Sequence, residues 1–316
     1  MSNKRTLHFF AIEKLTLLYI LITTIIILLI GVEFQSAIKL LTTRLLIVVF
    51  MALLAFISSK NDLKIIRFLR NVFVGLLLIL WYPETFDINR SLINYDHLLA
   101  YWEQFIFSCQ PALLFSHKVT QTWFCELMNM GYFAYYPLII CTGLYFYLLD
   151  IKYFKYFYFT VLMSFFIYYL IYIFFPTAGP QYYYSAIGLE NVKSGIFPAV
   201  GTYFDQHPVL TPAQTNVGGF FHGLVERTQR IGERPTAAFP SSHVGISTLI
   251  VLLIMRYRRR LFLFLVLPVY FVLVCSTVYI QAHYVVDVFA GFITAILLFC
   301  LSNAAYRVFS SPNSQY

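Results

Sequence analysis

The sequence predicts an all-α polytopic membrane protein with about eight transmembrane helices. Sixty per cent of its 316 residues are hydrophobic and only 11% are charged, whereas a soluble globular chain carries about a quarter charged residues. The apolar residues form long runs, and a helix of about twenty such residues crosses the hydrocarbon of a bilayer. The strands of a membrane barrel are much shorter and alternate apolar with polar residues. Helices are therefore the expected spanning elements.

Eight apolar runs separated by short basic or Pro/Gly-containing breaks predict these helices. In chain order they are Thr16–Gly31, Leu40–Ser58, Ile66–Tyr82, Thr122–Leu149, Tyr158–Phe175, Ser242–Arg256, Leu261–Ile280 and Tyr284–Leu301. The first run has no evident small-residue cleavage site after it, which favours a retained helix over a signal peptide.

Positive charge gathers at the ends of these runs. The clusters are Lys4–Arg5, Lys60 with Lys64, Arg67 and Arg70, Lys152 with Lys155, Arg256–Arg260, and Arg307. Eight crossings place all five clusters on one side, which the positive-inside rule identifies as the cytoplasm. The net charge of +8 therefore indicates membrane topology rather than a nucleic-acid partner. We expect an integral membrane protein with a cytoplasmic N-terminus, and the compact chain favours a bacterial inner membrane.

The chain is expected to divide into four parts. These are N-terminal transmembrane helices (residues 1–82), an outer amphipathic segment (83–121), a membrane core (122–306) and a cytoplasmic tail (307–316). In the amphipathic segment, apolar residues repeat at helical spacing from Tyr95 to Ile106, with Asp96, Glu103 and Gln104 on the other face. This pattern predicts a helix that lies in the membrane interface or packs on the protein's own outer surface. Pro111 is expected to end it.

A second polar stretch, Pro176–Ser241, predicts a long outer loop, and loops of this length usually carry function. Two cysteines, Cys109 and Cys125, could meet on the outer side, and the sequence leaves their pairing open. Glu126 lies in an apolar run, where a carboxylate is costly. It is expected to pair with an arginine of the outer loop or to sit at the membrane interface.

The stretch YIQAHYVVDVFAG (Tyr279–Gly291) places a histidine and a carboxylate four residues apart. On a helix, His283 and Asp287 would lie on one face, one turn from each other. A carboxylate bonded to one ring nitrogen fixes the histidine tautomer and leaves the other nitrogen free to act. This is the arrangement that a nucleophilic or basic histidine requires.

The stretch RPTAAFPSSHVGIS (Arg234–Ser247) predicts the start of a helix. Ser241 is a candidate N-cap, and the free N–H groups of a helix N-terminus form an anion site. His243 lies in the first turn and would face such an anion. One helix leads into the membrane after His243 and the next returns before His283, so the two histidines are expected to converge at the outer, periplasmic end.

Two histidines, a carboxylate, a helix N-terminus and nearby arginines are the groups that phosphoryl transfer uses. One histidine can attack phosphorus while the other protonates the departing oxygen, and positive groups hold the remaining oxygens. A metal site is a weaker alternative, because His243, His283 and Asp287 have no clear fourth ligand. No metal or cofactor is therefore expected. A non-catalytic lipid-binding or transport protein is the alternative from outside the enzyme class.

Two motifs resemble signatures of the type 2 phosphatidic acid phosphatase superfamily. PSSH at Pro240–His243 is similar to the second signature, Pro-Ser-Gly-His, and STVYIQAHYVVD at Ser276–Asp287 is similar to the third, Ser-Arg, five residues, His, three residues, Asp. The contexts PTAAFPSSHVG and FPTAGPQYYY resemble the branch that includes inositol phosphorylceramide synthases. The resemblance begins near Glu126–Pro137 and implies a six-helix, phosphatase-like core within residues 122–306.

The resemblance also implies residue roles. His283 would be the nucleophile that forms a phosphohistidine, Asp287 would orient it, and His243 would be the general acid for the leaving alcohol. Ser241 and Ser242 would hold phosphate oxygens through backbone N–H groups or hydroxyls.

The sequence departs from the family pattern in its cations. Thr277 stands where the third signature has arginine, and the first signature, Lys, six residues, Arg-Pro, is absent after the fifth run. A version with arginine for lysine runs from Arg227 to Arg234, so Arg227, Arg230 and Arg234 are candidate substrate-binding residues, together with Gln181. Fewer cations favour a singly charged diester over a phosphomonoester dianion.

We therefore expect a lipid phosphotransferase similar to inositol phosphorylceramide synthases. The alternative is a lipid phosphatase acting on phosphatidate, phosphatidylglycerol phosphate or polyprenyl diphosphate. The expected partners are phospholipid or sphingolipid substrates and the membrane, and the oligomeric state stays open.

Overall fold

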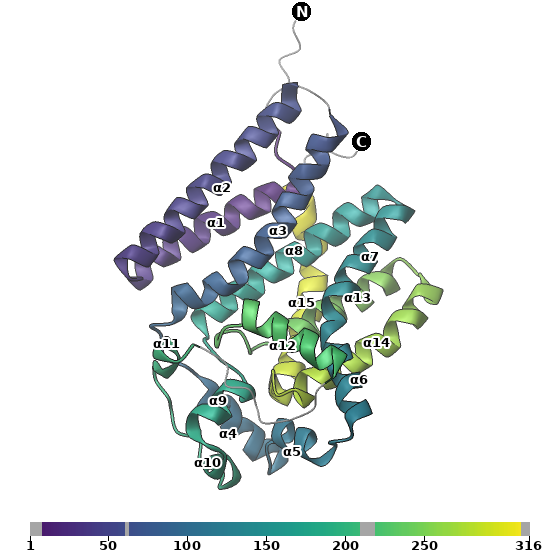
Figure 1. Ribbon diagram of the computed structural model, residues 1–316. Helices are drawn as coiled ribbons and strands as arrows, with labels where there is room; N and C mark the ends of the chain where they lie inside the picture. The colour runs from purple at the N-terminus through teal and green to yellow at the C-terminus, as the bar shows by residue number, and fades with distance from the viewer. Residues whose placement is uncertain (1–7, 61–62, 209–218, 311–316) are drawn as a thin grey trace, which may run out of the picture.

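The computed structural model describes residues 8–60, 63–208 and 219–310, and helices are the regular elements of those residues (Figure 1). Six of them are long and apolar enough to cross a membrane. These are α1 (Ala11–Ile30), α2 (Phe34–Lys60), α3 (Lys64–Asn89), α8 (Ile151–Phe174), α14 (Arg260–Tyr279) and α15 (Val285–Phe309). The all-α prediction is confirmed, and the long apolar helices fit an integral membrane protein.

The other two predicted spans take different forms, so the expected count of about eight is not confirmed among the described residues. The run Thr122–Leu149 is divided into α6 (Thr122–Phe133) and α7 (Tyr135–Leu149), which are bent by 46° at their junction and form a seventh span if counted together. Helix α13 (Ser242–Arg256) has 15 residues, or about 22 Å at 1.5 Å per residue, which is shorter than the roughly 30 Å of hydrocarbon. Its N-cap, Ser241, is fully buried, so α13 begins inside the protein.

Helix α8 lies at the centre of the helix bundle. It packs against α1, α3, α7, α13 and α15, and it carries many fully buried aromatic side chains. One of them, Phe166, stacks on Tyr19 of α1 with ring centroids 4.3 Å apart and contacts Trp81 of α3 edge-on at 5.3 Å. These contacts join the N-terminal helices to the rest of the molecule through apolar burial, which is dense and sensitive to volume changes.

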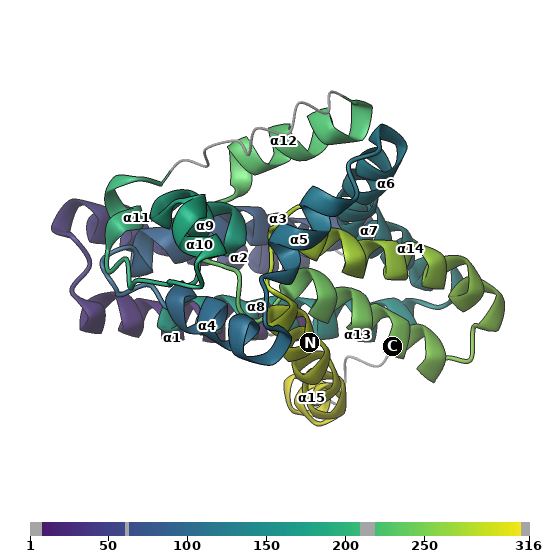
Figure 2. The same cartoon turned by 90° about the horizontal axis from the view of Figure 1, so that it is seen from below.

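The shorter helices gather at one end of the long ones (Figure 1). They are α4 (Asp96–Phe107), α5 (Pro111–Lys118), α9 (Pro180–Ile187), α10 (Leu189–Lys193), α11 (Tyr203–Gln206) and α12 (Phe220–Gly232). Helix α12 packs along α6, as Figure 2 shows. Both Cys109 and Cys125 are free, and the Cys125 Sγ lies 2.8 Å from the Tyr279 hydroxyl, which connects α6 to α14.

Helix α4 is the predicted amphipathic helix, with its polar face turned into the protein. Asp96 and Glu103 are completely buried, whereas Trp102 and Phe105 are 55% and 78% exposed. An apolar face turned outward suits a helix that contacts the membrane interface. The expectation that Pro111 ends this helix is wrong. It ends at Phe107 because Ser108 adopts a left-handed conformation (φ 55°), and Pro111 is the first residue of α5, where proline is favoured.

Candidate active site

The start of α13 is fixed against α15. The Ser241 Oγ accepts a hydrogen bond from the Val244 N–H at 3.3 Å, as an N-cap does. The Ser241 N–H donates to the Asp287 carbonyl of α15 at 3.1 Å. A side chain at Gly291 would place its Cβ 2.7 Å from the Ser241 carbonyl, so glycine permits this close approach. Together these contacts hold the first turn of α13, and His243 within it, beside the start of α15.

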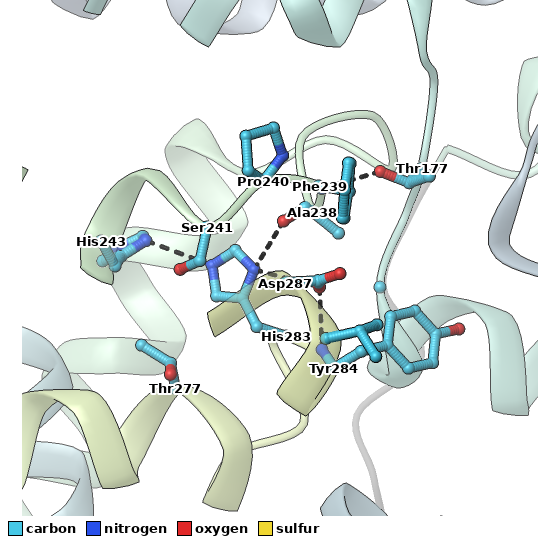
Figure 3. Close-up of polar contacts among 12 residues, drawn as sticks. Thr177, Ala238, Phe239, Pro240, Ser241, His243, Thr277, His283, Tyr284 and Asp287 are labelled. Atoms are coloured by element: carbon cyan, nitrogen blue, oxygen red, sulfur yellow. Dashed lines mark hydrogen bonds and ion pairs between the residues drawn. The ribbon is translucent and has the colours of Figure 1, made fainter. Parts of the chain in front are cut away.

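His283 lies in the turn just before α15, where Figure 3 shows its ring between Ala238, Asp287 and His243. Its Nδ1 is 2.8 Å from the Ala238 carbonyl oxygen and 3.5 Å from the Asp287 Oδ2. A carbonyl oxygen can only accept, so Nδ1 carries the proton and Nε2 keeps its lone pair. That Nε2 is 3.5 Å from the Nδ1 of His243.

The contact between His283 and Asp287 does not arise from one helical face, because α15 begins only at Val285. Asp287 instead bends back toward the turn, and its Oδ2 accepts the Tyr284 N–H at 2.8 Å. The main-chain N–H of His283 donates to the Thr277 carbonyl at 3.0 Å. These two hydrogen bonds, made by the N–H groups of His283 and Tyr284, fix the backbone that carries the His283 side chain.

Burial keeps the ring of His283 neutral. The residue is 3% exposed, and burial lowers its pKa to about 4, against the opposing influences of the Ala238 carbonyl and the Glu233 carboxylate. A cation is costly in such a site because it loses its hydration. At neutral pH the Nε2 lone pair is therefore available to a substrate.

The ring of His243 is sandwiched by two tyrosines that precede and follow the junction of α6 and α7. The Tyr132 ring stacks on it at a centroid distance of 4.5 Å and an angle of 22°, and the Tyr135 ring lies at 4.2 Å and 40°. Aromatic packing of this kind restricts the ring to one plane. The bend between α6 and α7 therefore contributes directly to the geometry of the site.

The two serines of PSSH are engaged within the protein. The Ser242 N–H donates to the Tyr172 hydroxyl at 3.2 Å, and that hydroxyl donates to the Pro240 carbonyl at 3.0 Å. The Ser241 hydroxyl serves as the N-cap acceptor described above. The helix N-terminus predicted to bind an anion therefore already has partners for two of its amides, those of Ser242 and Val244.

None of the three candidate arginines contacts His243 or His283 in the part of the chain that the structure describes. Arg230 forms a surface ion pair with Glu226 at 2.5 Å, and its side chain is 71% exposed. Arg227 is exposed on the same helix, and the Arg234 Nη1 donates to the Glu233 carbonyl at 2.7 Å. The structure thus brings His243, His283 and Asp287 together without a contact from these arginines to the histidines.

Glu126 does not pair with an arginine among the residues that the structure describes. Its two carboxylate oxygens accept hydrogen bonds from the Phe221 and His222 N–H groups at 2.9 and 3.0 Å. The Glu126 carboxylate thereby caps the N-terminus of α12. The expectation of an arginine partner is therefore wrong. Glu126 attaches α12 to α6, and α12 leads directly to the loop that carries Glu233 and Arg234.

Glu233 and Tyr132 are neighbours of the histidines that the sequence did not reveal. The Glu233 Oε1 accepts the Tyr132 hydroxyl at 2.7 Å, and its Oε2 accepts the Gln181 side-chain amide at 3.0 Å. Gln181 is held in turn by its N–H, which donates to the Gln281 carbonyl at 2.8 Å. Glu233 stands inside the basic stretch VERTQRIGERP, and no spacing rule distinguishes it from a surface acid.

A second carboxylate supports the site from α4. The Glu103 Oε1 accepts the Val285 and Val286 N–H groups of α15 at 2.5 and 3.2 Å. Burial, and then the charge of Asp287, raises the pKa of Glu103 to about 8. Glu103 thus caps the helix whose first turn carries Asp287.

Comparison with known protein families shows the superfamily to which the chain belongs. The sequence model of the PAP2 superfamily matches residues 97–301, well over half of the chain. The match starts within α4, upstream of the Glu126–Pro137 stretch where the motif resemblance begins. The comparisons with curated proteins and with solved structures found no match. Members of the superfamily are generally phosphatases or phosphotransferases that act on lipids. The matched region contains the paired histidines and most of α15, and the chain belongs to the PAP2 superfamily.

Proposed function

We propose that this protein is a membrane lipid phosphotransferase that moves a phosphate-linked headgroup through a phosphohistidine on His283, in the manner of inositol phosphorylceramide synthases. The observation that carries the proposal is the relation of the two histidines. The Nε2 of His283 has a free lone pair and lies 3.5 Å from the Nδ1 of His243. A nucleophile with an adjacent acid is the arrangement that covalent catalysis requires.

In the first step the His283 Nε2 attacks phosphorus. The new P–N bond forms while the P–O bond to the leaving lipid alcohol breaks, and His243 donates a proton to the departing oxygen. Because the two nitrogens are 3.5 Å apart, the phosphoryl group must part the two rings as it enters. The positive charge that develops on the His283 ring is stabilised at Nδ1 by the Ala238 carbonyl and by Asp287.

In the second step an acceptor hydroxyl attacks phosphorus, His243 takes its proton, and the P–N bond breaks. The site's charge supports a diester substrate for this cycle. The candidate arginines do not contact the two histidines, and a diester carries one negative charge where a phosphomonoester carries up to two. A singly charged substrate needs less positive charge around it.

The proposed site faces the outer side of the membrane. Helices α13 and α15 begin at the site, while Arg256 and Arg260 lie at the other end of α13 and at the start of α14. Basic residues mark the cytoplasmic side. The histidines would then receive lipid substrates from the outer leaflet.

Transfer is tested with purified protein and labelled lipids. We expect labelled phosphatidylinositol to yield labelled product only when ceramide is also present. His283→Ala should abolish the product, and His207→Ala should leave it unchanged, because His207 is exposed and stacks on Tyr203. Release of inorganic phosphate from phosphatidate alone would contradict the transferase and support a phosphatase that uses water as the acceptor. Equal failure of wild type and His283→Ala on every lipid would contradict an enzyme.

A further inference from the structure

A cluster of uncharged donors around one carboxylate lies beside the histidines, and the proposed chemistry does not use it. The Glu233 cluster consists of Glu233 together with Tyr132, Gln181 and Gln229. The Tyr132 hydroxyl and the Gln181 amide donate to Glu233 at 2.7 and 3.0 Å, and the Gln229 amide donates to the Gln181 Oε1 at 3.2 Å. These bonds orient the carboxylate within a chain of polar side chains from α6, α9 and α12.

The Glu233 cluster reaches the proposed reaction centre through Tyr132. The same ring whose hydroxyl binds Glu233 stacks on the ring of His243. The charge of Glu233 is also close enough to influence the pKa of His283. The carboxylate is therefore one aromatic side chain away from the position where a phosphoryl group would sit.

The carboxylate retains capacity for further hydrogen bonds. An ionised carboxylate has about four lone-pair positions, and the contacts described above occupy two of them. Glu233 is only half-buried, so a bound molecule can approach it. A phosphate oxygen would be repelled by the negative charge, so the group that Glu233 receives must be a hydrogen-bond donor.

We infer that the Glu233 cluster binds a second hydroxyl group of the acceptor alcohol, so that the enzyme prefers diols to simple alcohols and to water. This inference rests on the proposed transfer reaction. One hydroxyl of the diol would attack phosphorus beside His243, and the other would donate a hydrogen bond to Glu233. Water and a mono-alcohol cannot make both contacts at once.

A hydroxyl fits the Glu233 cluster better than an ammonium group does. The partners that Glu233 already has, a phenol and an amide, are uncharged donors. An amino-alcohol acceptor is therefore the competing outcome of the test.

The experiment compares three acceptors of equal chain length: a long-chain 1,3-diol, the corresponding primary alcohol and the corresponding amino alcohol. The donor is labelled phosphatidylinositol in detergent micelles. For wild type we expect the diol to have the highest kcat/KM. Glu233→Ala should lower kcat/KM for the diol by about 10- to 100-fold, as expected for a lost hydrogen bond to a charged group. It should change the value for the primary alcohol by less than about threefold.

Matched variants separate binding from folding. Glu226→Ala removes an acid from α12, the helix that precedes Glu233, where Glu226 pairs with Arg230, and should leave the acceptor preference unchanged. Tyr132→Phe keeps the ring that packs on His243 but removes the hydroxyl that orients Glu233. It should therefore weaken the diol preference in the same direction as Glu233→Ala, even if the latter folds poorly.

Each result bears on a different claim. Absence of any His283-dependent product in wild type would contradict the proposed function itself. Product with an unchanged ratio of diol to primary alcohol in both Glu233→Ala and Tyr132→Phe would overturn the inference alone. A wild-type preference for the amino alcohol that Glu233→Ala removes would also overturn it, in favour of a cation site.

Discussion

Helices α1–α3 and the part of the chain from α4 onward stabilise their buried charges in different ways. In α1–α3, each of two buried carboxylates faces an arginine. The Arg70 Nε donates to Glu13 at 2.7 Å, and the Arg44 Nη2 lies 2.5 Å from the Glu84 Oε1. All four side chains are at most 6% exposed. The charges of this region cancel in pairs.

From α4 onward, buried carboxylates are held by backbone amides. Asp96 accepts the Ala178 and Gly179 N–H groups at 2.5 and 2.8 Å, and Glu103 caps α15 as described above. One oxygen of Glu103 and one of Asp287 have no hydrogen-bond partner among the described residues. These carboxyl groups are oriented by hydrogen bonds and have no arginine partner among the described residues.

The difference separates a structural use of charge from a chemical one. A buried ion pair fixes two helices and cannot easily be broken, because either partner alone would be a buried, uncompensated charge. A carboxylate held by amides fixes the backbone without a bound cation. In its ionised form Asp287, which lies 3.5 Å from the His283 Nδ1, can stabilise a histidine that becomes positive during reaction. We therefore expect substitutions in α1–α3 to act on stability and those around the histidines to act on catalysis.

The largest catalytic effect in this comparison is expected for His243→Ala. Without the proton donor, transfer from a lipid with an alcohol leaving group should slow by about 10²- to 10⁴-fold. An analogue with a nitrophenol leaving group needs little protonation, so its cleavage should be much less affected. The measurement is kcat/KM for both donors, with thermal unfolding as the control. An equal loss on both donors would contradict the role of His243 as an acid.

The largest stability effect is expected for Arg44→Met. This change leaves the buried Glu84 carboxylate without its partner and should lower the free energy of unfolding by about 3–5 kcal/mol. The double variant Arg44→Met/Glu84→Leu removes both charges and should recover most of the loss. Thermal unfolding in detergent, with activity measured per folded molecule, tests this. Reduced turnover without a lower unfolding temperature would contradict the purely structural role of the Arg44–Glu84 ion pair.

Glu103 offers a smaller and more specific test. Glu103→Ala leaves two buried N–H groups of α15 without an acceptor, at about 1–3 kcal/mol for each such group. We expect the start of α15 to loosen and turnover to fall by about tenfold. Glu103→Gln keeps an oxygen that can accept the same bonds, so its turnover should stay close to that of wild type. Should both variants lose activity equally, the charge of Glu103 matters rather than its hydrogen bonds.

The smallest effect concerns pH. The nucleophile must be neutral, and burial lowers the pKa of His283 to about 4. Its reactive form is lost as pH falls through that value, so the acid limb of kcat/KM should be half-maximal near pH 4. Between pH 7 and 5, titration of this group should cost only about a tenth of the rate. A midpoint near the ordinary histidine value of 6.5 would contradict the burial of His283 in the active protein.

The helices were predictable from the sequence because long apolar runs have few alternative structures in a membrane. Their interruptions were not. The bend at Ala134 and the short α13 depend on contacts with other helices, and no local pattern records them. The two faces of α4 were visible in the sequence, but the orientation was not. Asp96 and Glu103 are turned inward because their partners are backbone N–H groups. Every residue except proline has such a group, so the sequence does not indicate which ones will bind a carboxylate.

The candidate site was predictable where a motif fixes its residues. The spacing of PSSH and of His283 with Asp287 indicated which residues to expect together. The contacts of Ala238, Tyr132 and Glu233 were not predictable, because they depend on how the stretch from Pro176 to Ser241 folds over the histidines. The contacts of the candidate arginines were not predictable for the same reason, and their role in substrate binding stays a prediction.

Trapping the covalent intermediate tests the central claim most directly. Protein is mixed with donor lipid labelled at the phosphate, quenched in alkali within the first turnovers, digested, and the label is mapped. We predict an acid-labile, alkali-stable label on the peptide that contains His283, none in His283→Ala and the full amount in His207→Ala. Turnover by wild type without labelled peptide at any time point, or label that persists in His283→Ala, would contradict the account.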